Sequence, residues 1–319
     1  MRYQLAQYSL RGARPTNQDR VAVGERDNAV LLVLADGLGG HLGGELAAET
    51  LTASVMRSFQ TVRQKVITRP SAFLAFAILR AHDEIQLRGR THRPPIEPRS
   101  TCVACVVQHG YAYWAHVGDS RLYHFRNGAI LRRTQDHTAV EQLREEGFLT
   151  DAEAGDHPIK GRLLKCVGGP NKPSIDLGPE TMLERGDSLL LCSDGLWSAL
   201  EPTEIARFLA RAALEEGVEE MLHAAEERTR GHSDNITAAC LRWEDERTSA
   251  PSLQGRMPMH VDEDTLREDA WIWRVETKIE QQRRELPKVP TERTRDTTPA
   301  DVKESIQEIE EFLRRFEPK

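Results

Sequence analysis

Two short apolar runs of this chain each end in an Asp-Gly pair. The first run covers residues 29–35 and leads into Asp36, and the second covers 188–192 and leads into Asp194. Apolar runs of this length, bounded by turn residues, are typical of buried β-strands. A buried strand that ends in a carboxylate directs a charge to the edge of the core. Two such strands therefore indicate two carboxylates aimed at a shared site.

The pattern of the first 245 residues predicts an α+β fold. Strands are expected at 4–10, 29–35, 101–108, 112–117, 121–126, 188–192 and 236–242, and helices at 44–59, 71–88, 138–146, 202–213 and 218–228. Tight turns such as His109-Gly110 and Asn127-Gly128 join several strands, which favours antiparallel meanders over parallel crossovers. We therefore expect antiparallel sheets with helices packed outside them.

The character of the sequence changes after Glu244. Residues 246–262 are polar and contain Pro and Gly, which is typical of a linker, and residues 263–319 are rich in charge with two helical patterns. We expect a first domain over 1–245, a linker over 246–262 and a charged helical extension over 263–319. The extension carries too little apolar surface for a core of its own. It either docks on the first domain, binds a partner or stays solvated.

Composition excludes several classes of protein. The formal net charge is −7 with Lys and Arg scattered, which argues against a nucleic-acid partner. No apolar run approaches the roughly 20 residues of a membrane span, and the N-terminus lacks the apolar core of a signal peptide. The five cysteines lie mostly in apolar runs, which favours reduced core thiols. We expect a cytoplasmic protein without a membrane span.

Five aspartates stand beside small residues at expected strand ends or turns: Asp19, Asp36, Asp119, Asp194 and Asp234. Each one alone has an ordinary explanation as a turn or helix-capping residue. Brought together, they would repel one another strongly unless a cation neutralised them. Oxygen ligands without His or Cys favour a hard divalent ion, Mg²⁺ or Mn²⁺, over zinc.

The segments around these aspartates resemble the metal-dependent protein phosphatases of the 2C type, particularly the bacterial branch. The motifs, in the order of that family, are R-x-x-N-x-D at 14–19, D-G-x-G-G-H-x-x-G-E at 36–45, G-D-S-R at 118–121, D-H at 136–137, S-D-G-L-W at 193–197 and D-N at 234–235. The resemblance covers about residues 1–245 and not the extension. It implies a four-layer sandwich, two central antiparallel β-sheets flanked by α-helices, followed here by a C-terminal helical tail.

The resemblance also implies the roles of the site residues. The four catalytic residues would be Asp36, Arg14, Asp194 and Asp234. Asp36 would bridge two metal ions, the Gly37 carbonyl would hold one of them, and Asp194 and Asp234 would hold the other. Asp19 would reach the ions through water, Asp119 would join Asp194 at a third ion, and Arg14 would bind the substrate phosphate.

The implied activity is that of a protein serine/threonine phosphatase that requires Mn²⁺ or Mg²⁺. Water or hydroxide bridging the two ions would attack the phosphorus of phosphoserine or phosphothreonine in protein substrates, opposing a serine/threonine kinase. Two alternatives are a pseudophosphatase scaffold and a two-metal nuclease. The first is disfavoured because no expected carboxylate is replaced, and the second because no basic groove with aromatic residues is visible.

Three positions depart from or vary within that family. Leu38 stands where some members have His, so the proton for the leaving group would come from metal-bound water or from His41. Gln18 replaces a Glu that is frequent there and removes one acidic group near the site. The insert at 138–161 matches the variable flap beside the active site and is either a substrate-facing lid or a solvated excursion.

Overall fold

The computed structural model describes residues 1–38, 43–150, 153–154 and 157–246. His41, the extension expected at 263–319 and all but the first residue of the expected linker lie outside the described residues, so those expectations stay predictions. Within the described residues, no helix combines the length and apolar character that a membrane crossing requires.

The first of the two main sheets has six strands, with the order β10-β6-β5-β3-β2 and β11 added on β6. Its strands are β2 (Asp19–Arg26), β3 (Ala29–Asp36), β5 (Cys102–Gln108), β6 (Tyr111–Val117), β10 (Asp176–Leu177) and β11 (Thr181–Met182). All of its pairings are antiparallel.

The second main sheet has five antiparallel strands in the order β1-β13-β12-β7-β8. Its strands are β1 (Tyr3–Leu10), β7 (Arg121–Arg126), β8 (Ala129–Arg133), β12 (Ser188–Cys192) and β13 (Ile236–Trp243). A small separate pair joins β4 (Arg99–Ser100) to β9 (Val167–Gly168).

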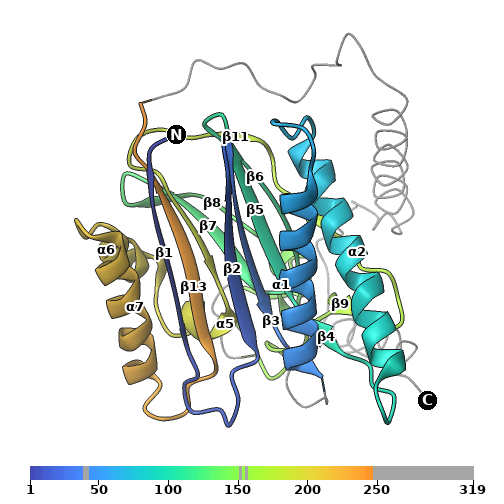
Figure 1. The fold of residues 1–319 in the computed structure, drawn as a ribbon. Helices are drawn as coiled ribbons and strands as arrows, with labels where there is room; N and C mark the ends of the chain where they lie inside the picture. Colours follow the sequence, from blue (N-terminus) through green and yellow to red (C-terminus); the bar gives the residue numbers. More distant parts are fainter. Residues whose placement is uncertain (39–42, 151–152, 155–156, 247–319) are drawn as a thin grey trace, which may run out of the picture. The chain divides into compact units, whose positions relative to one another are not determined.

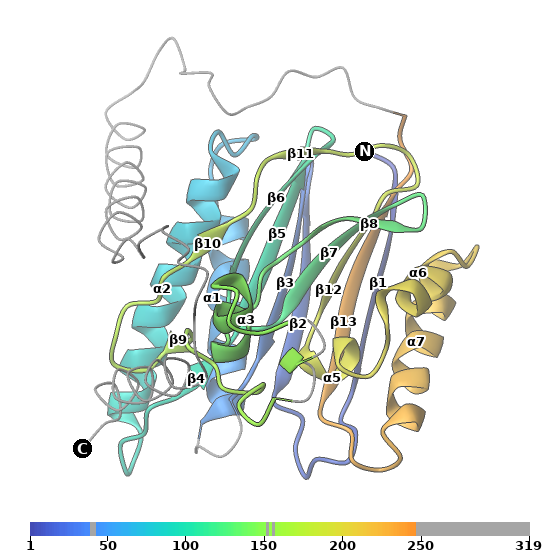
Figure 2. The same ribbon diagram turned by 180° about the vertical axis from the view of Figure 1, so that it is seen from behind.

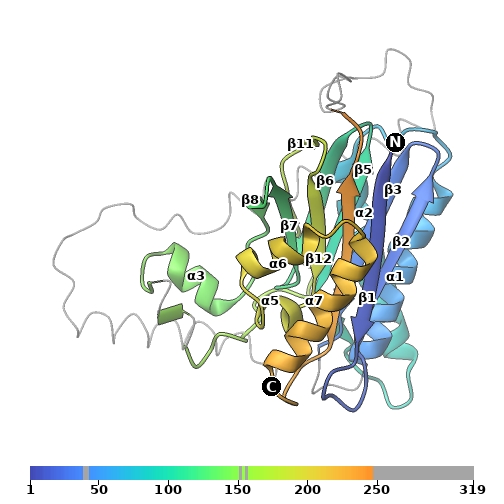
Figure 3. The same cartoon turned by 90° about the vertical axis from the view of Figure 1, so that its left-hand side faces the viewer.

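Six helices accompany the sheets in the described residues, and four of them, two for each sheet, cover the outer faces. The six are α1 (Gly44–Thr61), α2 (Pro70–Thr91), α3 (Ala139–Glu145), α5 (Asp194–Trp197), α6 (Pro202–Leu209) and α7 (Leu214–Arg228). Figure 1 shows α1 and α2 on one side, α6 and α7 on the other, and the sheets between them. Figure 3 shows α3 standing beside the sheets rather than covering either.

The apolar run of β3 is continuous because the strand is buried on both faces. Leu31 and Val33 pack in the cluster under α1 and α2, whereas Leu32 and Leu34 pack between the two sheets. All four are 0% exposed. Successive side chains of a strand point to opposite faces, so a central strand of this kind reads as an unbroken apolar segment. Each buried leucine contributes about 2 kcal/mol relative to an exposed one.

The expected α+β class with two main antiparallel sheets and helices is confirmed. All seven expected strands and all five expected helices are present, but the helix expected over 202–213 ends at Leu209. Strands β2 and β8 were not expected, because both are sheet edges with charged residues that hide the alternation. The five cysteines are free thiols, with Cys102 on the helix side of its sheet and Cys105 between the sheets.

Candidate active site

Asp36 and Asp19 lie opposite each other at one end of the β2–β3 pair. The Asp36 backbone is fixed by three hydrogen bonds. Its N–H donates to the Thr101 hydroxyl (3.0 Å), and its carbonyl accepts from the Thr101 N–H (2.8 Å) and the Ser100 hydroxyl (2.8 Å). Sequence reasoning gave Ser100 and Thr101 no role. Two hydroxyl residues directly before an apolar strand could have indicated hydrogen bonds to the end of a neighbouring strand.

Gly37 directly follows β3 and lies against the start of α1 with no room for a side chain. Its N–H donates to the Gln18 carbonyl (3.2 Å). A Cβ at Gly37 would overlap the backbone of Gly44, the first residue of α1, and would press on Gln18. The glycine of this Asp-Gly pair is therefore required by the close approach of α1, and not by an unusual backbone angle.

The second Asp-Gly pair is connected through Ser193 to Asp19, which lies opposite Asp36 on the neighbouring strand. Asp194 is the first residue of α5, directly after β12 and Ser193. The Ser193 hydroxyl donates to Asp19 Oδ2 (2.7 Å) and accepts from the Thr237 N–H (3.0 Å). Figure 2 shows α5 at the same end of the sandwich as the start of α1. The two strand ends converge as expected, and a serine whose role the sequence left unassigned holds them together.

Asp234 and Arg14 form an ion pair, with Arg14 Nη2 2.6 Å from Asp234 Oδ2. The Arg14 side chain is 56% exposed, so part of its guanidinium faces solvent. Asn235 holds the loop that carries Arg14: its side-chain amide donates to the carbonyls of Arg11 (2.8 Å) and Thr16 (3.0 Å). The Asn of the D-N motif is therefore a loop anchor, a role that sequence reasoning did not assign.

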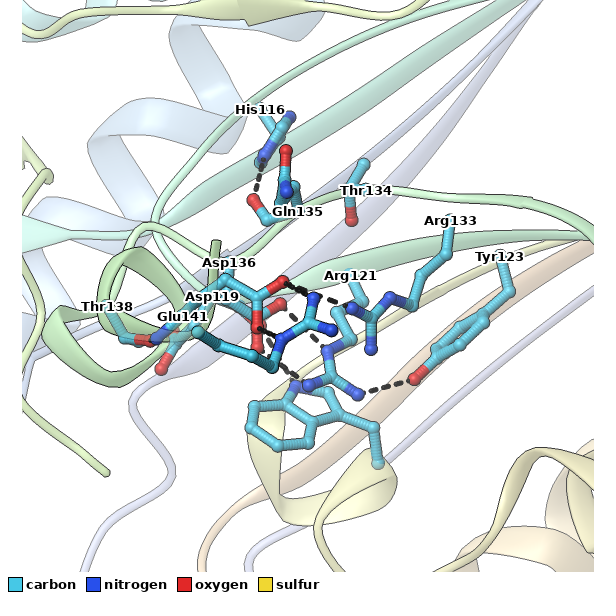
Figure 4. Close-up of polar contacts among 12 residues, drawn as sticks. His116, Asp119, Arg121, Tyr123, Arg133, Thr134, Gln135, Asp136, Thr138 and Glu141 are labelled. Atoms are coloured by element: carbon cyan, nitrogen blue, oxygen red, sulfur yellow. Dashed lines mark hydrogen bonds and ion pairs between the residues drawn. The ribbon is translucent and has the colours of Figure 1, made fainter. Parts of the chain in front are cut away.

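Asp119 lies in the turn between β6 and β7 and is 6% exposed. Gly118 takes a left-handed backbone conformation there, with φ of 104°. The motif residues Arg121 and Asp136 form a forked ion pair beside this turn, with N–O distances of 2.8 and 2.7 Å (Figure 4). The turn is thus attached to the segment that leads into α3.

The five aspartates act on one another electrostatically. Burial raises the pKa of Asp36 well above its ordinary value, and the charges of Asp19 and Asp194 raise it further. Burial also raises the pKa of Asp194, with Asp119 and Asp234 adding to the shift. Burial raises the pKa of both Asp19 and Asp119 to about 6. The structure therefore brings together all five carboxylates that the sequence singled out.

The donor set of this cluster fits a hard divalent cation. Residues Asp36, Asp194 and Asp234 are half-buried, and Asp19 is 3% exposed with one oxygen, Oδ1, that has no hydrogen-bond partner. Buried unpaired carboxylate oxygens and mutual repulsion are both relieved by such a cation. Among the described residues, no three Asp, Glu, His or Cys side chains are already closed around one ion position. Asp234 instead turns to Arg14.

Comparison with known proteins identifies the chain. The sequence model of the family described as protein phosphatase 2C matches residues 7–239. A putative protein phosphatase 2C-type of Streptococcus pyogenes is 30% identical over 236 residues, which cover 73% of this chain and 94% of that protein.

Solved structures give the same result. The serine/threonine phosphatase of S. agalactiae matches with a TM-score of 0.69 and 29% identity over 76% of this chain and 100% of that chain. The catalytic domain of the serine/threonine phosphatase PstP, solved with two manganese ions, matches with a TM-score of 0.63 and 28% identity over 76% of this chain and 99% of that chain.

The two-sheet fold, the aspartate cluster and these matches together define a protein phosphatase. The chain belongs to the protein phosphatase 2C family.

Proposed function

We propose that the chain hydrolyses phosphoserine and phosphothreonine in proteins with two Mn²⁺ or Mg²⁺ ions. The convergence of Asp19, Asp36 and Asp194 from two different sheets is the observation that carries this proposal. The negative charges of these carboxylates repel one another when no cation is present, and bound cations compensate for that repulsion. The two manganese ions of the PstP structure support the same reading.

Each residue has a role in this proposal. Asp36 would bind both ions, the Gly37 carbonyl would hold one of them, Asp194 and Asp234 would hold the other, and Asp19 would contribute through water. When bound, the ions supply the Lewis acidity that activates water for direct attack on the phosphorus atom. Arg14 would bind the phosphate through the part of its guanidinium that faces solvent, while its Nη2 pairs with Asp234.

The ion pair between Arg14 and Asp234 determines where a bound phosphate would lie relative to the ions. It places the phosphate-binding cation 2.6 Å from a residue proposed as a metal ligand. The Asn235 anchor fixes the backbone of the loop that carries Arg14. Phosphate bound by Arg14 would therefore lie next to the ions without a rearrangement of that loop.

A metal-dependence assay tests the proposal. EDTA-treated protein should hydrolyse a phosphothreonine peptide only after Mn²⁺ or Mg²⁺ is added, and Asp36→Asn should lower the rate by at least about a thousandfold. Asp187→Asn should keep most of the rate. Asp187 is a buried aspartate that contacts Arg126, at the end of β7 away from Asp119. Hydrolysis that persists in EDTA, or an Asp36→Asn variant with full activity, would contradict the proposal.

Several broader expectations belong to the same proposal. The finer architecture is the four-layer sandwich followed by a C-terminal helical tail, and the partners are phosphorylated proteins and an opposing serine/threonine kinase. A third ion at Asp119 and Asp194 is part of it. So is a cytoplasmic location, which the five free cysteines support.

A further inference from the structure

The turn that carries Asp119 is held from several sides. The Gly118 N–H donates to His137 Nδ1 (3.1 Å), and the His137 N–H donates to the Gly118 carbonyl (3.0 Å). The hydroxyls of Ser120 and Thr101 share a hydrogen bond of 2.7 Å. These contacts fix the backbone on both sides of Asp119 but do not reach α5, which carries Asp194.

Trp197 supplies the connection to α5. It is the last residue of that helix, three positions after Asp194, and its indole N–H donates to the backbone carbonyl of Asp119 (2.9 Å). One turn of helix thus holds Asp194 at its start and contacts Asp119 at its end. The spacing of these two carboxylates depends on where the Trp197 ring lies.

Arg121 lies over that ring. Its guanidinium carbon is 3.5 Å from the centroid of the Trp197 ring, which is a stacked cation–π contact. The same guanidinium donates two hydrogen bonds to the Asp136 carboxylate, at 2.8 and 2.7 Å, and one to the Tyr123 hydroxyl at 2.7 Å (Figure 4). Its side chain is only 13% exposed, and that of Asp136 is 6% exposed. The Arg121 plane therefore has a single well-defined orientation.

Asp136 extends the connection toward the flap. It is followed by His137 and by Thr138, whose hydroxyl caps α3 by accepting from the Glu141 N–H (3.2 Å). Glu141, in the first turn of α3, is held by Arg144 Nη2 at 2.6 Å. The base of the flap and the Asp119 turn are therefore linked through the short segment 136–138.

We propose that Arg121 is a positioning residue that holds Trp197 against Asp119, and thereby sets the affinity of an outer divalent cation held between Asp119 and Asp194. This inference rests on the proposed function. Arg121 touches neither substrate nor cation in this role. It acts through the stacked indole and through the fork on Asp136, so the geometry of the guanidinium matters as well as its charge.

Arg121→Lys in the full-length chain tests the proposal because lysine keeps the charge but loses the fork and the flat stacking surface. Isothermal titration of EDTA-treated protein with Mn²⁺ should show the weakest site weakened by at least about tenfold, with the two tighter sites changed by less than about twofold. Trp197→Phe keeps a ring under Arg121 but loses the indole N–H. It should weaken the same site by about threefold.

Arg126→Lys is the matched control. Arg126 is the last residue of the same strand, β7, at the end away from Asp119. It donates two hydrogen bonds to the buried Asp187, at 2.8 and 2.7 Å. This variant should lose stability to a similar degree but leave all Mn²⁺ affinities within about twofold. Should Arg121→Lys fail to fold by circular dichroism, Asp136→Asn weakens the same fork from the other side and is judged by the same criterion.

The outcomes separate this inference from the proposed function. Equal weakening of the outer site in Arg121→Lys and Arg126→Lys, or no weakening in Arg121→Lys, overturns the role of Arg121. A wild-type protein that binds only two Mn²⁺ ions and hydrolyses phosphopeptide also overturns it, but leaves the proposed function standing. A wild-type protein that binds no Mn²⁺ overturns both.

Discussion

Asp36 shows how a residue proposed for catalysis lowers the stability of its own fold. Burial and the charges of Asp19 and Asp194 raise the pKa of its carboxyl group. At a neutral pH, well above the ordinary pKa of an aspartate, the folded protein must keep this group charged among like charges or bind a proton. Replacement by the uncharged isostere removes that cost.

Asp36→Asn should therefore raise the free energy of unfolding of EDTA-treated protein at about pH 7 by at least about 1 kcal/mol. Urea unfolding followed by circular dichroism measures this. With Mn²⁺ present the order should reverse, because the wild-type protein gains the binding energy of the ions. A variant that is less stable than the wild-type protein in EDTA would show that Asp36 is not electrostatically strained.

Asp187 is the opposite case. It is 1% exposed, and burial would raise its pKa, but hydrogen bonds from Arg126 and His124 outweigh burial and lower the pKa to about 2. A carboxyl group whose pKa is lower in the folded state stabilises the fold above its unfolded pKa of about 4, and this stabilisation disappears as the pH falls through about 2.

The advantage of the wild-type protein over Asp187→Asn should therefore shrink by about 2 kcal/mol between about pH 5 and pH 2. Urea midpoints of both proteins at successive pH values give this difference directly. A difference that stays constant across the range would mean that Asp187 has the same pKa in the folded and unfolded chains.

At the scale of elements, the junction between β3 and α1 constrains the site most tightly. A Cβ at Gly37 would overlap the backbone of Gly44 and press on Gln18. Gly37→Ala should therefore push α1 away from β3, lowering the free energy of unfolding by about 2 kcal/mol and displacing Asp36. The phosphopeptide assay and thermal unfolding measure the two effects.

Gly161→Ala is the control for that substitution, because a Cβ at Gly161 meets nothing within 4 Å and the residue has no left-handed backbone angle. It should leave both stability and rate nearly unchanged. A Gly37→Ala variant that behaves like Gly161→Ala would show that the junction tolerates displacement of α1.

The elements differ in how well the sequence predicts them. Central strands such as β3 and β12 were predicted to within one residue, because burial on both faces leaves an unambiguous apolar run. The edge strand β8 is exposed throughout, so its sequence carries no alternation to find. Helix α5 has only four residues, too few to show helical periodicity.

The site itself was predictable only in part, because some of its contacts join residues that lie far apart along the chain. Its five aspartates carry recognisable motifs, and the structure brings them together. The contact of the Ser193 hydroxyl with Asp19 joins residues 174 positions apart, and no local pattern announces such a contact. The same holds for the contact of Trp197 with Asp119.

At the scale of the whole molecule, both main sheets in the described part of the chain are assembled from residues 3–243. Strand β13 ends at Trp243 between β1 and β12, and the following Asp245 pairs with Arg2 (2.9 Å). A chain truncated after Glu246 should therefore fold and should hydrolyse phosphopeptide within about twofold of the full-length rate. Thermal unfolding and the phosphopeptide assay check this. A large loss of rate or of stability would assign the extension a role in the phosphatase domain.

The most direct test of the account is a crystal structure of the full-length protein soaked in Mn²⁺, with anomalous scattering used to locate the ions. The account predicts two strong peaks beside the carboxylates of Asp36, Asp194 and Asp234, with Asp19 close by and Arg14 facing them. Peaks that lie elsewhere on the molecule, or these carboxylates pointing away from one another without any peak between them, would contradict it.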